Sequence, residues 1–256
     1  MIILPQLRGA LSARRVGSGG GGSPGGSPGG GGSPTDGDPY FSDVVLLLHF
    51  GGSHGSTTFT NSATRGPATV TAAGAASIST TQSKFGGSSF RPGAGYIWYA
   101  SGGADHTFAV ADEFTMEWWQ RADTVTADQY PFMWNNNRWG LYSINPGKPK
   151  WIVDSTNRIT GADNLIIVDT WQFISYTRII AGGPTYTGVL HVDGVNVGTW
   201  TDNFGWGQSL CIGAYDKDTA LNFQGYIDEV RVTKGVARYT TSNYTPPTAA
   251  FPDSPP

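Results

Sequence analysis

A sandwich of two antiparallel β-sheets is the fold class that the sequence predicts, on three observations. Short strand-like runs with period-two alternation recur along residues 38–256. Turn signals such as Pro92-Gly93, Pro146-Gly147 and Asp193-Gly194 separate these runs. Helical periodicity nowhere lasts much beyond one turn, and residues 236–239 are the best short candidate. Many short strands with frequent turns and no long helix indicate a sandwich.

The chain begins with a short arm, residues 1–16, whose apolar side chains are spaced along an otherwise mixed sequence. Sixteen residues cannot form a core by themselves, so we expect these side chains to dock on a partner. An arm without fixed structure stays open as the alternative. The predicted anchoring residues are Ile2, Ile3, Leu4, Leu7 and Leu11.

A linker follows over residues 17–37, with the sequence GSGGGGSPGGSPGGGGSPTDG. A glycine-rich coil of this length has a root-mean-square span of roughly 25 Å and stretches to roughly 70 Å. Its glycines do not recur at every third position, as a collagen triple helix requires. The linker is therefore predicted to be a flexible tether.

Residues 38–256 are predicted to form one domain, because single-domain sandwiches reach this size. Asp193-Gly194 is predicted to be the two-residue turn of a hairpin, since glycine supplies the positive φ of a type I′ turn. The expected strands are 43–50, 68–72, 95–99, 114–121, 139–144, 151–153, 171–180, 186–192, 195–200, 209–214 and 223–233.

Alternation also predicts which way side chains point in two of these strands. In 114–121, Phe114, Met116 and Trp118 are expected to face the core, which leaves Trp119 on the opposite face, half exposed or on a concave surface. In 223–232, the same rule sends the neighbouring carboxylates Asp228 and Glu229 to opposite faces.

Five segments, in order along the chain, resemble the laminin-G-like (concanavalin A-like) jelly-roll modules that occur in bacteriophage virion proteins. The resemblance covers residues 40–252 and none of the arm, and it implies a jelly-roll sandwich. Residues 235–239 and 244–247 resemble the tail of the phage versions. The five segments are 44–50 (VVLLLHF), 83–90 (SKFGGSSF), 114–121 (FTMEWWQR), 171–178 (WQFISYTR) followed by 191–194 (HVDG), and 225–232 (GYIDEVRV).

Charge and cysteine content exclude several function classes. The formal net charge is −3. Because residues 1–37 carry three arginines and one aspartate, the remainder is acidic by five charges. An acidic body without basic clusters disfavours a nucleic-acid partner. No apolar stretch approaches the ~20 residues of a membrane helix, and the N-terminus does not match an export signal. Cys211 is the only cysteine, which rules out an internal disulfide.

Catalysis is not expected. A retaining glycosidase needs two carboxyl groups about 5 Å apart on one side of the sugar. Asp228 and Glu229 are expected on opposite faces, and Glu117 has no acidic neighbour at 115, 119 or 121. None of the four histidines has metal-ligand spacing, so no metal or other cofactor is predicted. Calcium stays open as an alternative through the loop residues Asp202, Asn203, Asp216 and Asp218, although solvated turns explain them better.

Aromatic residues beside amides predict a carbohydrate site. A flat apolar ring stacks on a pyranose while amide groups bind its hydroxyls. Loop-like segments supply most of these rings, including Trp98-Tyr99. Rings that fill the core or pack between copies are the alternative. The candidate sugar-binding residues are Trp119, Trp134, Asn135, Asn137, Trp139, Trp206 and Tyr215.

The expected function is a non-catalytic virion protein that displays a lectin-like module. Through its arm it binds other virion proteins of the head or the tail, and it adheres to host-surface glycans. A purely structural decoration protein and a glycoside hydrolase remain as alternatives. The resemblance implies assembly in the host cytoplasm and release in the virion. Neither a nucleic acid nor a membrane is an expected partner, and homo-oligomerisation stays open.

Overall fold

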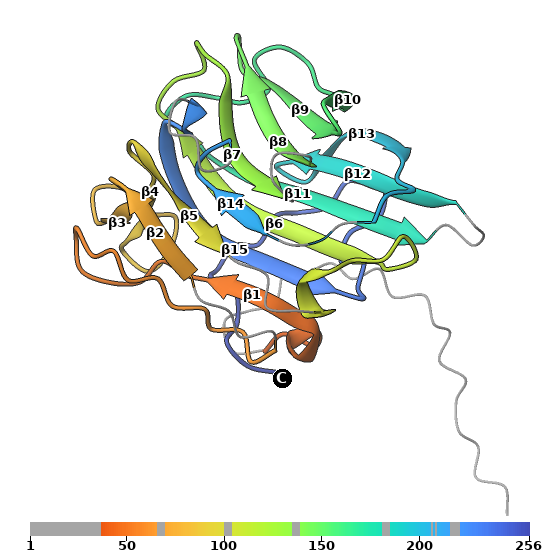
Figure 1. The fold of residues 1–256 in the computed structure, drawn as a ribbon, viewed down its shortest axis with the longest axis horizontal. Helices are drawn as coiled ribbons and strands as arrows, with labels where there is room; N and C mark the ends of the chain where they lie inside the picture. The colour runs from red at the N-terminus through yellow and green to blue at the C-terminus, as the bar shows by residue number, and fades with distance from the viewer. Residues whose placement is uncertain are drawn as a thin grey trace, which may run out of the picture.

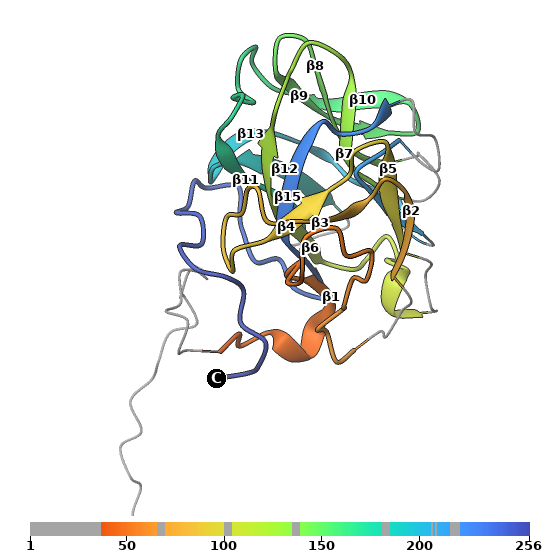
Figure 2. The ribbon, with the colours of Figure 1, turned by 90° about the vertical axis from the view of Figure 1, so that its left-hand side faces the viewer.

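The computed structural model describes residues 37–256, apart from 66–69, 100–103, 135–138, 181–184, 206, 208 and 216–220. Two antiparallel sheets face one another in this range (Figures 1 and 2), which confirms the predicted all-β sandwich. Two 3-10 turns, Phe41–Asp43 and Ala104–His106, are its helices, so residues 236–239 are not helical. No helix in the described ranges has the length and apolar character needed to cross a bilayer. The arm residues Ile2, Ile3, Leu4, Leu7 and Leu11 lie outside the described residues.

Sheet A has eight strands in the order β13-β12-β11-β6-β15-β4-β3, with β1 also paired to β15. Its strands are β1 Val44–Leu48, β3 Ser77–Ser79, β4 Ser89–Arg91, β6 Phe114–Ala122, β11 Trp171–Ile180, β12 Tyr186–Val192, β13 Val195–Thr201 and β15 Gly225–Lys234. The β12–β13 turn confirms the predicted hairpin, because Asp193 and Gly194 have φ of 51° and 74°.

Sheet B has seven strands in the order β10-β9-β8-β7-β14-β5-β2. Its strands are β2 Val70–Gly74, β5 Gly95–Tyr99, β7 Gln129–Trp134, β8 Trp139–Ile144, β9 Lys148–Val153, β10 Thr156–Thr160 and β14 Leu210–Ile212. All eleven expected strands overlap observed ones, with residues 68–69 of the expected strand 68–72 outside the described residues. β3, β4, β7 and β10 were not predicted.

The main core fills the space between the sheets. Trp118 of β6 stacks on Phe132 of β7, with ring centroids 4.5 Å apart, and Trp151 of β9 stacks on Tyr176 of β11 at 3.8 Å. Each pair joins one sheet to the other, and aromatic burial of this kind dominates core energetics. Phe114, Met116 and Trp118 all belong to this core, as alternation predicts.

A second apolar cluster lies on the outer side of sheet A. There the C-terminal segment packs Tyr239 and Phe251 against Phe173 and Trp119. Trp119 faces away from the main core as expected, but it is only 5% exposed. The expectation of a half-exposed Trp119 is therefore wrong, because residues distant in sequence cover it.

A β-bulge in β15 changes which face of the sheet its side chains point to. Asp228 pairs with Trp119 and Arg231 with Glu117, so β15 uses one residue more than β6 between these two pairs. Glu229 takes φ of 49° at the bulge. Ile227 and Val230 both enter the main core, three residues apart. Asp228 and Glu229, which lie between these two residues, both make contacts on the outer side of sheet A. The prediction that their side chains point to opposite faces is therefore wrong.

Candidate functional site

The structure places four of the predicted sugar-binding residues, and three of those are buried. Trp134 and Trp139 pair across β7 and β8, and their rings lie in the main core, 1% and 5% exposed. Both stand on strands, which agrees with the expected strand 139–144 for Trp139, whereas the loop-like position expected for Trp134 is wrong. Trp119 is buried on the other side of sheet A, whereas Tyr215 is partly exposed. Asn135, Asn137 and Trp206 lie outside the described residues.

The outer side of sheet B carries a group of aromatic rings that includes Tyr215. We call Tyr96, Trp98, Tyr130, Tyr142 and Tyr215 the aromatic face. These five rings surround the buried side chains of Met133, Ile152 and Cys211 in a cluster separate from the main core. Tyr130 is 9% exposed, and the other four rings are more exposed than that.

Alternation along each strand positions these rings. In β5, Ile97 and Tyr99 enter the core while Tyr96 and Trp98 point outward. Cys211 of β14 pairs with both Trp98 and Met133, so the three side chains form one row across the sheet. Of these rings, Tyr215 is a predicted sugar-binding residue. Trp98 falls within the expected strand 95–99, so its grouping with the loop-like rings is wrong.

The tyrosines of the aromatic face pack against each other. Tyr130 stacks on Tyr142 with centroids 5.2 Å apart, and Tyr215 tilts against Tyr130 at 4.7 Å. Burial raises the pKa of Tyr130 to about 12, with nearby Asp128, Tyr142 and Tyr215 adding to the effect. The Tyr142 hydroxyl donates to Oδ1 of exposed Asn157 at 2.7 Å. The face thus offers flat rings bordered by neutral polar groups.

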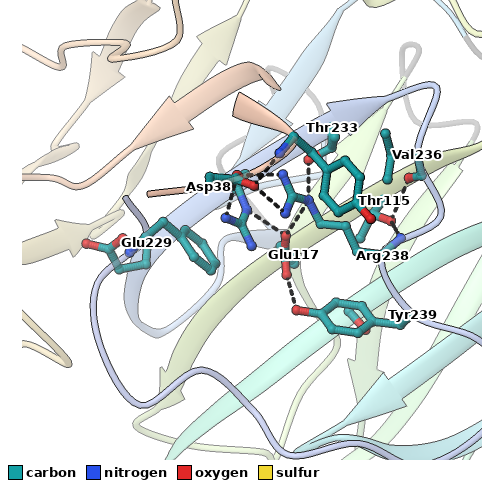
Figure 3. A network of polar contacts seen from close by, with 12 residues as sticks. Asp38, Thr115, Glu117, Glu229, Thr233, Val236, Arg238 and Tyr239 are labelled. Atoms are coloured by element: carbon teal, nitrogen blue, oxygen red, sulfur yellow. Dashed lines mark hydrogen bonds and ion pairs between the residues drawn. The ribbon is translucent and has the colours of Figure 1, made fainter. Parts of the chain in front are cut away.

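A buried charge network on sheet A accounts for Glu117 (Figure 3). Arg231 Nε donates to Glu117 at 2.7 Å, and Tyr239 Oη donates to its other oxygen at 2.5 Å. Arg231 and Arg238 also hold Asp38, at 3.0 Å and 2.6 Å. Burial alone would raise the pKa of Asp38, but the bond from Arg238 and the two positive charges outweigh it and keep that pKa lowered. This network fastens both ends of the domain and presents no carboxylate to solvent.

The carboxylates of Asp228 and Glu229 also make hydrogen bonds within the protein. Burial raises the pKa of Asp228 to about 7, against the bonds it accepts from the backbone N–H groups of Phe85 and Lys84. Glu229 accepts from the backbone N–H of Phe251 and lies 2.9 Å from His49 Nδ1. Both carboxylates are buried, so they are not arranged as an open acid–base pair around a sugar.

The structure describes one of the three aspartates considered as calcium ligands, Asp202. Asp202 is fully buried, accepts from Tyr176 Oη at 2.7 Å and lies 3.7 Å from Arg178 Nη1. Asn203 is exposed, and Asp216 and Asp218 lie outside the described residues. Within the described ranges, no group of three or more His, Cys, Asp or Glu side chains is arranged to hold a metal ion.

Comparison with protein families gives one match. Residues 93–238 match the model described as the concanavalin A-like lectin/glucanases superfamily. That stretch includes all of β6, β7, β8 and β9 and ends just beyond β15. No curated protein matches the sequence significantly.

Solved structures with the same fold are distant in sequence. The botulinum neurotoxin serotype D binding domain superposes with a TM-score of 0.58 and 12% identity, covering 78% of this chain. The chain spans about half of that domain, 51%. The binding domain of botulinum neurotoxin DC in complex with SialylT gives 0.54 and 13%, covering 77% of this chain and 49% of that one.

Another solved structure shares the fold over most of its own length. Domain 4 of AbnA, a GH43 extracellular arabinanase from Geobacillus stearothermophilus, was solved in complex with arabinotriose. It superposes with a TM-score of 0.50 and 15% identity, covering 76% of this chain and 94% of that domain. At these identities the likeness shows the shared fold.

Proposed function

Because the chain belongs to the concanavalin A-like lectin/glucanases superfamily, we propose that it is a non-catalytic glycan-binding module whose ligand lies on the aromatic face. The observation that carries this proposal is the clustering of five rings on one side of sheet B. Rings used only for the core are buried, as Trp118 and Trp151 are. The rings of the aromatic face keep part of their surface in solvent.

Stacking chemistry supports a sugar as the ligand. Aromatic rings offer flat apolar surface to the C–H faces of a pyranose or furanose, and tyrosine adds a hydroxyl at the ring edge. Asn157 supplies an exposed amide beside Tyr142. Two of the similar structures were solved with a saccharide or a SialylT ligand, which favours the same class of ligand here as an analogy of fold.

Removal of single rings tests this function. Trp98→Ala and Tyr142→Ala are expected to weaken glycan binding about tenfold each, equivalent to about 1.4 kcal/mol. The measurement is a glycan array followed by titration calorimetry on the best ligand. Tyr226→Ala is the matched control, because Tyr226 is a partly exposed ring on β15 of sheet A. Equal losses in all three variants, or a loss in Tyr226→Ala alone, would place the ligand elsewhere.

We propose further that the module is displayed on a bacteriophage virion through residues 1–16. The motifs shared with phage modules and the apolar positions Ile2, Ile3, Leu4, Leu7 and Leu11 support this placement. Many tethered copies would turn weak single-site binding into strong adhesion.

Deletion of residues 1–16 is expected to abolish incorporation into particles and to leave glycan binding unchanged. Quantitative blotting of purified particles measures the first effect. Normal incorporation of the truncated protein would contradict the anchoring role of the arm. A protein that is incorporated but binds no glycan would instead favour a purely structural decoration protein.

A further inference from the structure

The seven strands of sheet B, as the structure describes them, contain no aspartate and no glutamate. Their charged residues are three, Lys148, Lys150 and Arg158, and all are basic. All three lie on the neighbouring strands β9 and β10 at one edge of the sheet. This pattern is the reverse of the domain as a whole, which is acidic by five charges.

Lys148 and Lys150 stand two residues apart on β9 but differ in their partners. The ammonium of Lys148 lies 2.7 Å from Asp163 Oδ1, so its charge is matched. Among the described residues, no carboxylate oxygen lies within ion-pair distance of Lys150. Asp128 and Asp154, the acidic residues nearest in sequence to these strands, lie in connecting loops.

Lys150 borders the aromatic face directly. It pairs with Tyr142 across β8 and β9, and its Nζ lies 5.6 Å from the centroid of the Tyr142 ring. A sugar stacked on Tyr142 would therefore bring its ring substituents beside this ammonium. A neutral hydroxyl would accept a hydrogen bond from this ammonium, whereas a carboxylate would also gain the attraction between two opposite charges.

We infer that the ligand of the aromatic face is an acidic glycan whose carboxylate pairs with Lys150. This inference rests on the proposed glycan binding and names the class of sugar. The acidic remainder of the domain repels an acidic glycan, so binding is directed to the sheet whose described strands carry no carboxylate. Lys150 thus contributes selection between charged and neutral sugars, while the rings contribute stacking.

The test uses the full-length protein and pairs of oligosaccharides that differ only in their carboxyl groups. One member of each uronate- or sialate-containing pair is free acid and the other is its methyl ester. Wild-type protein is expected to bind the free acids about fivefold more tightly at low salt. The preference should largely disappear in 1 M NaCl, where the screening length falls to about 3 Å.

Two lysine variants and one ring variant separate the possible outcomes. Lys150→Ala should remove the preference for the free acids, and Lys148→Ala should keep it because Asp163 already matches that charge. Ester bound as tightly as acid by the wild type, or equal effects of the two lysine variants, would overturn the acidic-glycan inference and leave the proposed function standing. Trp98→Ala should weaken both members of each pair. If it weakens neither, or if the wild type binds no pair, the proposed function itself fails.

Discussion

Two aspartates near the start of the domain show how strongly burial changes the contribution of an ion pair to stability. Asp38 has a side chain that is 2% exposed and contacts both Arg231 and Arg238. Asp43 is 38% exposed and pairs with the similarly exposed Arg65. Water screens the Asp43–Arg65 pair but hardly reaches the pairs of Asp38. Substitution of Asp38 and of Asp43 should therefore have different effects on stability.

Asp38→Ala is expected to lower the free energy of unfolding by about 3–5 kcal/mol, because it leaves two buried arginines with one carboxylate. Asp43→Ala should cost less than about 1 kcal/mol. Urea unfolding followed by tryptophan fluorescence measures both. Equal, small losses would show that the buried network contributes little to stability.

His49 makes stability depend on pH. Burial by itself would lower the pKa of its imidazole, but the bond and the charge of Glu229, then those of Asp253, raise that pKa to about 9. A group whose pKa is raised on folding stabilises the folded state fully when the pH is below its pKa in the unfolded chain, here about 6.5. It loses this contribution as the pH rises through its folded-state pKa of about 9.

The stability advantage of wild type over His49→Gln should therefore shrink by about 1–3 kcal/mol between pH 6 and pH 9.5. Urea titrations at several pH values measure it. His54→Gln serves as the control, since His54 is exposed. An advantage that stays constant across this range would contradict the assigned ion pairs.

Among elements, alternation made the long strands predictable and left others unrecognised. β11 and β12 were predicted at their observed bounds, because the turn signals Gly182-Gly183 and Asp193-Gly194 delimit them. β3 and β4 are three residues each, too short for a period to be read. β7 is buried on both faces and contains Pro131, so its sequence lacks an alternating pattern.

The candidate site was less predictable than the fold for a related reason. The sequence shows which residues are aromatic, but burial on the outer side of a sheet depends on segments far away in the chain. Lys84 and Phe85 pack against the ring of Trp119, whereas Trp98 stays partly exposed. The bulge at Glu229 was equally hidden, because 223–232 reads as one regular strand.

Close packing between β12 and its neighbours gives a prediction at this scale. A Cβ at Gly188 would lie 2.0 Å from Tyr176 Oη and 2.5 Å from Trp200 Nε1, which are joined by a hydrogen bond. Gly188→Ala should therefore destabilise the domain by about 1–3 kcal/mol. Gly205→Ala is the control, since the nearest atom to its Cβ would be 3.7 Å away. Thermal unfolding that is unchanged in Gly188→Ala would contradict this packing.

At the scale of the whole molecule, the ends of the domain and the proposed ligand site lie on different sheets. The outer side of sheet A receives both ends of the domain, where the N–H of Asp38 donates to the carbonyl of Ser254 at 2.8 Å. The linker therefore joins the domain on that side. The aromatic face lies on the outer side of the other sheet, which suits a module tethered to a particle on one side and open to a ligand on the other.

The structure of the full-length protein with a bound oligosaccharide, chosen as the best ligand from a glycan array, tests the central claim most directly. We predict a sugar ring stacked on Trp98 or Tyr142, with a carboxylate group at Lys150. A saccharide bound on the outer side of sheet A, for example over Tyr226, would contradict the assignment of the aromatic face as the binding site.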